Sequence, residues 1–224
     1  MFERLTPTVR VLLIANVAIF AAQLYLPQLP FEWFELWPLH SSPLAGGMPF
    51  EPWQLVSYAF LHGSPAHLFF NMFALYMFGP DVEDLLGGKR FRIYYLACVV
   101  GAGISQQLVT ATIYPSMVPT LGASGGIFGL LLCYGMAYPH RRLMLIFPPI
   151  PMPAWLFVTL YGLAELYMGV FQSNQGVAHF AHLGGMAAGY LLIRYWRAQR
   201  RAARHEGHLS RSYGRRPRSR CARQ

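Results

Sequence analysis

The sequence predicts an all-α membrane protein built as a bundle of six transmembrane helices. Hydrophobic residues make up 54% of the chain and charged residues only 12%, a composition typical of a protein that faces lipid. Basic residues are confined to the two ends of the chain and to alternate connections between six apolar runs. These runs cover approximately residues 10–28, 65–79, 91–111, 122–137, 153–171 and 178–196.

The first apolar run follows Arg4 and Arg10, as the hydrophobic part of a signal peptide would. No clear cleavage site with small residues follows it, and five further runs come after it. We therefore interpret the first run as a retained helix. Several runs are shorter than the ~20 residues that a lone spanning helix needs, so we expect a bundle with re-entrant connections.

The distribution of basic residues indicates the orientation of the chain, because cytoplasmic connections are enriched in Lys and Arg. The connections at 29–64, 112–121 and 172–177 contain neither residue. We therefore expect both termini in the cytoplasm. All basic residues of the chain then lie on the cytoplasmic side: Arg4, Arg10, Lys89, Arg90, Arg92, Arg141, Arg142 and those from Arg194 onward.

The first outer connection, residues 29–64, is long and rich in aromatic residues, among them Trp33, Phe34 and Trp37. Tryptophan at this density is typical of the membrane interface. We expect this connection to be partly helical and to lie in the outer leaflet as a membrane-associated loop.

The C-terminal segment differs in composition from the rest of the chain. Ten of the 18 Lys and Arg residues follow residue 195, in a segment poor in aromatic residues. We expect a membrane domain over residues 1–197 and a basic, disordered cytoplasmic tail over residues 198–224. Because the net charge of +9 is concentrated in this tail, it favours contact with anionic lipid over contact with nucleic acid.

The fourth run opens on an octet, Gly122 to Gly129, that places Ser124 among four glycines. Glycine inside a helix costs about 1 kcal/mol relative to alanine, so this density needs a reason. One reason is packing, since small residues four apart, such as Gly125 and Gly129, let two helices approach closely. The other is a functional hydroxyl at Ser124. The octet alone leaves both interpretations open.

Polar residues of the second, fourth and sixth runs fall at one depth of the membrane. The second run carries His67 and Asn71 on one helix face, the fourth carries Ser124, and the sixth carries His179 and His182. In the predicted topology all three runs start at the outer surface. Ionisable groups inside a membrane are costly and are therefore functional candidates. We expect these side chains to converge in the outer third of the bilayer.

A metal site is the alternative use of the histidines, because His179 and His182 could bind a metal together with His62 or His67. The chain has no HExxH motif, no acidic ligand accompanies these residues at that depth, and its three cysteines are far apart. We therefore predict no metal. Glu165, in the fifth run, is expected to hydrogen-bond within the bundle and has no assigned role.

The polar residues fit serine acyl transfer. A serine hydroxyl becomes a nucleophile when an adjacent base takes its proton, and histidine is the usual base. The oxyanion that forms needs preorganised donors, which Asn71, His67 and the backbone N–H of Ser124 could supply. No Asp or Glu lies near His182 in the sequence, so Ser124 and His182 would act as a dyad unless the fold brings an acid to them.

Three motifs follow one another along the chain. They are His62-x4-His67-x3-Asn71 in the second run, Gly122-Ala123-Ser124-Gly125 in the fourth, and Ala181-His182-Leu183-Gly184-Gly185 with Gly189 in the sixth. In this order and on these runs they resemble the rhomboid family of intramembrane serine proteases, of the bacterial six-span type. The resemblance covers about residues 50–190.

Two further positions fit the same resemblance. Glu83 follows Asn71 by twelve residues, as in the family, and Trp53 matches the tryptophan of the family's Trp-Arg signature. Gln54 stands in place of the arginine. This departure affects a structural contact in the first connection rather than the chemistry.

The resemblance implies a rhomboid-like six-helix bundle with a water-accessible cavity open to the outer side. Ser124 would be the nucleophile and His182 the general base, with His67, Asn71 and the Ser124 backbone N–H as oxyanion hole. The family uses no cofactor or metal.

The substrates implied by the resemblance are transmembrane proteins, cut in or near a membrane-spanning segment close to the outer face of a bacterial inner membrane. The alternative is an inert rhomboid-like protein that binds membrane clients without cutting them. Such relatives usually lack the serine, the histidine or both, whereas Ser124 and His182 are both present.

The glycines of the sixth run predict how its helix packs. Gly185 and Gly189 lie on the side of the helix that carries the candidate base. We expect them to pack against Gly125 and Gly129 of the fourth helix, which would bring the serine and the histidine together. Gly184 is expected to point away from this contact.

Overall fold

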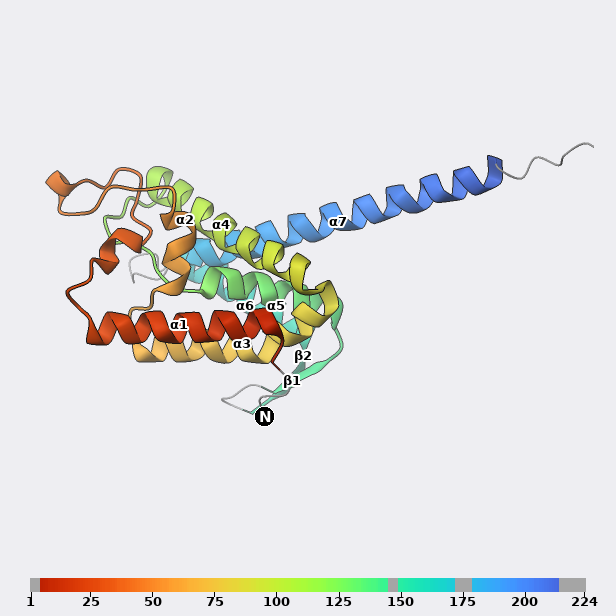
Figure 1. Ribbon diagram of the computed structural model, residues 1–224, viewed down its shortest axis with the longest axis horizontal. Helices are drawn as coiled ribbons and strands as arrows, with labels where there is room; N and C mark the ends of the chain where they lie inside the picture. Colours follow the sequence, from red (N-terminus) through yellow and green to blue (C-terminus); the bar gives the residue numbers. More distant parts are fainter. Residues whose placement is uncertain (1–4, 145–148, 172–178, 214–224) are drawn as a thin grey trace, which may run out of the picture. The chain divides into compact units, whose positions relative to one another are not determined.

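The computed structural model describes residues 5–144, 149–171 and 179–213. The chain divides into two compact units, Met1–Tyr190 and Leu191–Gln224. The elements, in which η denotes a short 3-10 helix, are α1 (Pro7–Tyr25), η2 (Phe31–Phe34), η3 (Pro43–Ala45), α2 (Gln54–Ser57), η4 (Tyr58–Phe60), α3 (Pro65–Leu86), α4 (Gly88–Thr112), α5 (Ser124–Ala137), β1 (Arg142–Met144), β2 (Pro151–Pro153), α6 (Ala154–Phe171) and α7 (His179–Tyr213) (Figure 1).

Helix α5 forms the core of the first unit. It contacts α3, α4 and α6, and most of its residues are buried. Its glycines permit a close approach of α4, because a Cβ on Gly126 would lie 2.7 Å from the ring of Tyr95 and one on Gly129 would overlap Cys98. The glycine density that the sequence shows around Ser124 is therefore used for helix packing.

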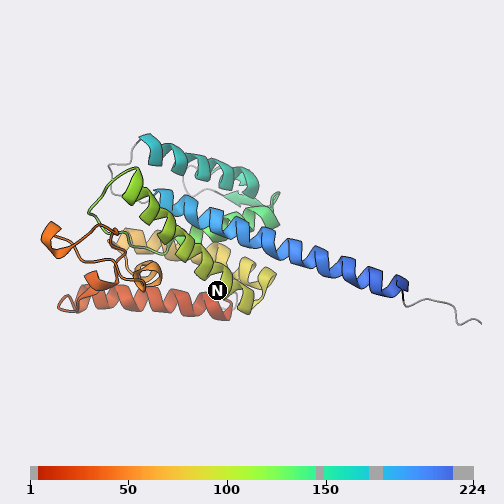
Figure 2. The same ribbon diagram turned by 90° about the horizontal axis from the view of Figure 1, so that it is seen from above.

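Helices α1 and α6 lie on opposite sides of the first unit, as Figure 2 shows. Both expose large apolar side chains, which are stable in hydrocarbon and unfavourable in water. By length and composition α1, α4 and α6 are each able to cross a membrane, and α5 is a shorter apolar helix of 14 residues. These observations confirm the prediction of a helical membrane bundle. The exposed residues include Val11, Ile14 and Val17 of α1 and Leu160, Leu163 and Leu166 of α6.

A buried carboxylate joins α1 to α3. Glu83 of α3 accepts hydrogen bonds from the backbone N–H groups of Thr8, at 3.1 Å, and Val9, at 3.0 Å, and from the hydroxyl of Thr6. The first N–H groups of a helix have no acceptor within the helix, and the positive end of the helix dipole favours a negative charge. Glu83 therefore caps α1 from the neighbouring helix.

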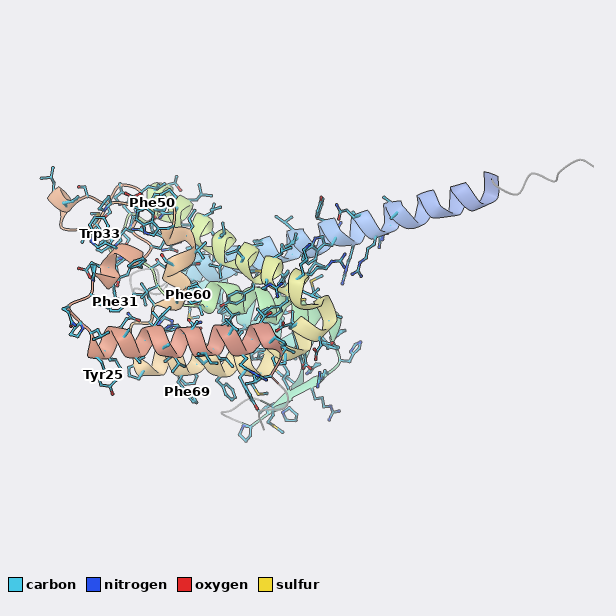
Figure 3. All side chains as sticks on the ribbon, in the orientation of Figure 1. Tyr25, Phe31, Trp33, Phe50, Phe60 and Phe69 are labelled. Carbon is cyan, nitrogen blue, oxygen red and sulfur yellow. The ribbon has the colours of Figure 1, made fainter. Side chains whose placement is uncertain are left out.

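The first outer connection carries an aromatic belt. Figure 3 labels four aromatic residues of this connection toward the end of the first unit where α1 ends, with one residue of α1 and one of α3 near them. Aromatic rings are enriched where hydrocarbon meets water, which agrees with a membrane-associated loop. The labelled residues are Tyr25, Phe31, Trp33, Phe50, Phe60 and Phe69.

Two glutamine side chains fasten this connection to the bundle. Gln54, which is fully buried, accepts the backbone N–H of Trp37 at 3.1 Å and donates to the carbonyl of Trp33. Gln107 of α4 accepts the N–H of Leu39 at 3.0 Å and donates to the carbonyl of Trp37 at 2.7 Å. The glutamine that replaces the arginine of the Trp-Arg signature therefore satisfies loop backbone groups.

The connection between α3 and α4 is much shorter than the sequence suggests. Helix α3 continues through Pro80 to Leu86 rather than ending near residue 79, and only Gly87 separates it from α4. Gly87 has a φ of +77°, a left-handed conformation that glycine adopts readily. Proline removes one backbone donor but does not prevent a helix held by its neighbours from continuing.

The C-terminal part also differs from the prediction. Helix α7 continues to Tyr213, past Ala198, where the sequence predicts that a disordered tail begins. The domain boundary at residue 197 stays a prediction. The segment from 198 to 213 contains no proline and several strong helix formers, which explains the longer helix.

A short hairpin between α5 and α6 is an element that the sequence analysis does not predict. Strands β1 and β2 pair antiparallel, with Leu143 opposite Met152. Proline at 151 and 153 disfavours a helix here and is compatible with extended backbone at the edge of a sheet.

Candidate active site

A cavity of about 520 Å³ lies where the first turns of α3, α5 and α7 meet. It brings together four residues that the sequence places at one depth, His67, Asn71, Ser124 and His182. The remaining lining is largely apolar, as is usual for a ligand pocket that holds a few polar groups. It includes Phe70, Ala74, Ile127, Phe128, Leu131 and Tyr161.

Ser124 is the first residue of α5, and its Oγ lies 2.7 Å from Nε2 of His182. The first-turn N–H groups of a helix have no acceptor within the helix, so they are available to a ligand beside the hydroxyl. Gly122 precedes the helix with a φ of +122° and lies outside it. A Cβ on Gly122 would stand 2.7 Å from the ring of His67, so conformation and space both require glycine.

The imidazole of His182 is held on two sides. Its ring stacks on Phe128 of α5, with ring centroids 4.3 Å apart and an interplanar angle of 7°. Its Nδ1 lies 2.8 Å from Oε2 of Glu165, so that Nε2 faces Ser124. Phe128 follows Ser124 by one helical turn, and α5 therefore supplies both the hydroxyl and one wall for the ring.

Glu165 of α6 is buried, with 4% of its surface exposed, and it contacts two histidines through one oxygen. Oε2 lies 2.7 Å from Nδ1 of His179 as well as 2.8 Å from Nδ1 of His182. The expectation that Glu165 hydrogen-bonds within the bundle is met. The sequence leaves open whether the fold brings an acid to His182, and in the structure Glu165 of α6 lies beside it.

Glu165, His179 and His182 are also the described residues that could hold a metal, since their ligand atoms lie within 4.8 Å of one another. The N–O distances of 2.7 and 2.8 Å are those of hydrogen bonds. A zinc ion would lie about 2.0–2.2 Å from each ligand and would have to enter between atoms that already bond one another. The geometry therefore fits a hydrogen-bonded cluster.

His67 and Asn71 approach the serine from α3. The N–H of His67 donates to Oγ of Ser64, which caps the helix at 3.1 Å and orders its first turn. Nδ2 of Asn71 is buried and has no hydrogen-bond partner among the residues that the structure describes. A Cβ on Gly122 would lie 2.7 Å from Nε2 of His67 and 3.7 Å from Nδ2 of Asn71. Both side chains therefore flank the backbone that leads into Ser124.

His62, the other histidine of the second-run motif, is not in the lining of the cavity. It is 2% exposed, and its ring lies edge-on to His67 with centroids 5.0 Å apart. Burial, and secondarily the nearby His67, lowers the pKa of His62 to about 4. The ring is therefore neutral at pH 7 and lies where it supports His67.

The glycines of α7 contact two helices rather than one. A Cβ on Gly185 would overlap the carbonyl oxygen of Gly125, which is the predicted contact with α5. A Cβ on Gly189 would overlap the hydroxyl of Tyr94 in α4, and this hydroxyl donates to the carbonyl oxygen of Gly129 at 2.8 Å. The predicted contact with α5 is therefore present at Gly185, whereas Gly189 and Gly129 both lie against the hydroxyl of Tyr94.

Gly184 lies against α4 rather than α5. A Cβ at this position would overlap Cβ of Ser105 and stand 2.9 Å from the carbonyl oxygen of Gly101, both in α4. Gly184 therefore points away from the contact with α5, as expected, but the position is not open, because it packs against α4.

Glu83 and Trp53 are not in the lining of the cavity. Glu83 caps α1, as described above, and Trp53 donates its indole N–H to the carbonyl of Trp33 at 3.2 Å. Their surroundings are those of structural residues.

Two residues of the site, Glu165 and Phe128, have no role that the sequence predicts. Glu165 is the lone acid of an otherwise apolar helix, which signals a buried polar contact but not its partner. Phe128 lies four residues after Ser124, and this spacing places the aromatic ring on the same helix face. Neither signal identifies His182 as the partner without the fold.

The chain resembles known proteins over the part that contains this site. Residues 49–199 match the family described as Rhomboid domain. The chain is 32% identical over 138 residues to the mitochondrial rhomboid protein 1 of Saccharomyces cerevisiae, and the match covers 61% of this chain and 40% of that protein.

Bacterial relatives match the same part. The rhomboid protease GluP of Bacillus subtilis is 33% identical over 142 residues, which cover 62% of this chain and 25% of the relative. The rhomboid protease GlpG of Serratia proteamaculans is 29% identical over 170 residues, which cover 74% and 54%. The chain thus spans about half or less of these relatives. Since the match to the domain extends over most of the chain and includes the cavity, the protein is a multi-pass integral membrane protein of the rhomboid family, whose members are generally intramembrane serine proteases.

Proposed function

We propose that this chain is an intramembrane serine endopeptidase that uses Ser124 as nucleophile and His182 as general base. The observation that carries the proposal is the 2.7 Å contact between Ser124 Oγ and His182 Nε2 inside a largely apolar cavity. A nucleophile and a base within hydrogen-bond reach, with a further group orienting the base, form the arrangement that activates serine.

The proposed reaction proceeds in two halves. Ser124 Oγ attacks the carbonyl carbon of the scissile peptide bond while Nε2 of His182 takes the hydroxyl proton. The tetrahedral intermediate collapses, the C–N bond breaks, and His182 gives the proton to the leaving amine. Water then attacks the resulting serine ester with His182 again as base, which releases the acid product and restores the hydroxyl.

The oxyanion of the intermediate is assigned to three donors, the backbone N–H of Ser124 and the side chains of His67 and Asn71. Nδ2 of Asn71 is a buried donor without a partner among the described residues, so it can bond a substrate oxygen without first breaking a bond. The position of Ser124 at the start of α5 adds the positive end of the helix dipole.

The proposed substrates are transmembrane proteins, cut in or near a membrane-spanning segment. The distribution of basic residues supports an orientation with both termini in the cytoplasm and the first turns of α3, α5 and α7 toward the outer side. We assign the protein to a bacterial inner membrane, and its site to the outer half of that membrane.

The decisive experiment is cleavage of a transmembrane substrate by the purified chain in liposomes. Ser124→Ala, His182→Ala and the double variant should each show no cleavage, because residues that act as a unit are not additive. A serine-reactive phosphonate should label Ser124 only when His182 is present. Cleavage by Ser124→Ala at the parental rate would overturn the proposal, and binding of substrate without cleavage by the parent chain would favour the inert client-binding alternative.

A further inference from the structure

We propose that Glu165 is a positioning residue that completes a Ser124–His182–Glu165 triad. This inference rests on the proposed function, because it assigns Glu165 a role in orienting the base of that reaction. Glu165 lies 17 residues before His182 in the chain and on another helix, yet its Oε2 is 2.8 Å from Nδ1 of His182. On the opposite edge of the same ring, Nε2 is 2.7 Å from Ser124 Oγ.

The shared oxygen determines which ring nitrogens carry a proton. Oε2 of an ionised carboxylate accepts hydrogen bonds and donates none, so Nδ1 of His179 and Nδ1 of His182 must both be N–H groups. In neutral His182 this leaves Nε2 with a lone pair directed at the hydroxyl of Ser124. If Glu165 were protonated and donated to Nδ1, Nε2 would carry the proton and His182 could not act as a base.

His179 helps to stabilise the buried carboxylate of Glu165. Glu165 is 4% exposed and His179 is 6% exposed, so neither group is solvated by bulk water. An isolated carboxylate is very costly in such a place, whereas one that accepts two N–H bonds is compensated in part. The ionisable neighbours of the cluster are Tyr161 on α6 and His67 on α3.

The proton balance of the triad is simple. The proton of Ser124 moves to Nε2 of His182 as the Oγ–C bond forms, and the resulting imidazolium keeps its Nδ1–H bond to Glu165. The carboxylate stays ionised and stabilises the positive ring. The same proton then leaves Nε2 for the amine of the departing peptide, and Glu165 neither gains nor loses one.

The kinetic test compares Glu165→Gln with two control variants of the full chain in liposomes. Removing the charge of the acid in such a triad lowers kcat by up to about 10⁴-fold, so we expect a loss between about 10² and 10⁴ in kcat with KM unchanged. His179→Gln should lower kcat much less, because the hydrogen bond between Glu165 and His182 remains. Glu83→Gln removes a buried carboxylate far along the chain and should lower the melting temperature without this selective loss in kcat.

A spectroscopic test measures which ring nitrogen of His182 is protonated. Nitrogen-15 spectra of His182 in the parent chain should show a protonated Nδ1 and an unprotonated Nε2 near neutral pH. In Glu165→Leu, which keeps the volume but removes the acceptor, this preference should be lost while the phosphonate reaction of Ser124 slows. A parent His182 protonated at Nε2, or a Glu165→Gln variant with the parental kcat, would overturn the inference.

Further outcomes distinguish the triad from the proposed protease activity and from a metal site. Loss of cleavage in Ser124→Ala together with full activity in Glu165→Gln would leave the protease intact and reject the triad alone. Activity in Ser124→Ala would reject both. Inactivation by EDTA that zinc restores would make Glu165 a metal ligand and would also reject the triad.

Discussion

The α-carbon of Gly185 lies so close to the carbonyl oxygen of Gly125 that no side-chain carbon fits between them. This contact joins α7 to α5 one residue after Ser124 and three residues after His182. The backbones of the two helices therefore set the 2.7 Å distance between hydroxyl and imidazole.

Gly185→Val is predicted to abolish the proposed proteolytic activity while the chain still inserts into the membrane. The added carbons must displace the helices by an ångström or more, and a misplacement of that size can cost ~10²-fold in rate. Cleavage rates in liposomes measure the effect. The matched control is Gly162→Ala in α6, where a Cβ would meet the flexible Met186 at 3.4 Å and activity should be kept. Full activity in Gly185→Val would mean that this contact does not hold the site together.

Gly184→Ala is predicted to destabilise the chain, although helical periodicity alone suggests a mild effect. Its Cβ would press on Ser105 and on the backbone of Gly101, so α7 must move away from α4. Overpacking of this kind typically costs about 1–3 kcal/mol, which should appear as a lower melting temperature. A variant as stable as the parent chain would show that α4 yields at this point.

Asn71→Ala and His67→Ala are predicted to lower the proposed proteolytic activity strongly without abolishing it. Removal of one oxyanion donor typically lowers kcat by about 10²–10³-fold, because the lost bond acts mainly in the transition state. Steady-state kinetics separate kcat from KM. If both variants kept kcat and raised only KM, these side chains would serve substrate binding rather than oxyanion stabilisation.

The stability of the parent chain is predicted to fall as the pH drops from about 6.5 toward 4. An unfolded histidine titrates near pH 6.5, whereas burial lowers the pKa of His62 to about 4. Between these values the unfolded state binds a proton that the folded state excludes, so acid favours unfolding. Thermal unfolding of His62→Phe should show a weaker pH dependence, whereas His40→Phe, at an exposed histidine, should behave like the parent chain.

The proposed orientation can be tested without enzymology. In a chain carrying Cys221→Ser, a cysteine in place of the exposed Met117 should react with an impermeant reagent from outside the cell. A cysteine in place of Gln199 should react only after permeabilisation. The two remaining cysteines, Cys98 and Cys133, are buried and should contribute little background. The reverse pattern would place the cavity on the cytoplasmic side.

The sequence by itself determined the helical membrane class and the set of residues that meet in the cavity. Apolar runs and a one-sided distribution of basic residues specify helices and their direction, because both follow from the solvation of side chains. Helix direction in turn places the first residues of three helices at one membrane surface. This is why His67, Ser124 and His182 could be grouped without coordinates.

Only the tertiary structure decided which side chains touch. Periodicity shows that Gly185 and Gly189 share a helix face. The rotation and crossing angle of α7, however, depend on packing. In the structure Gly185 packs against α5, and Gly189 packs against Tyr94 of α4. The same packing turns Glu165 toward His179 and His182. A lone acid in an apolar helix indicates a buried polar contact. Which residue makes that contact depends on how the neighbouring helices are arranged, not on distance along the chain.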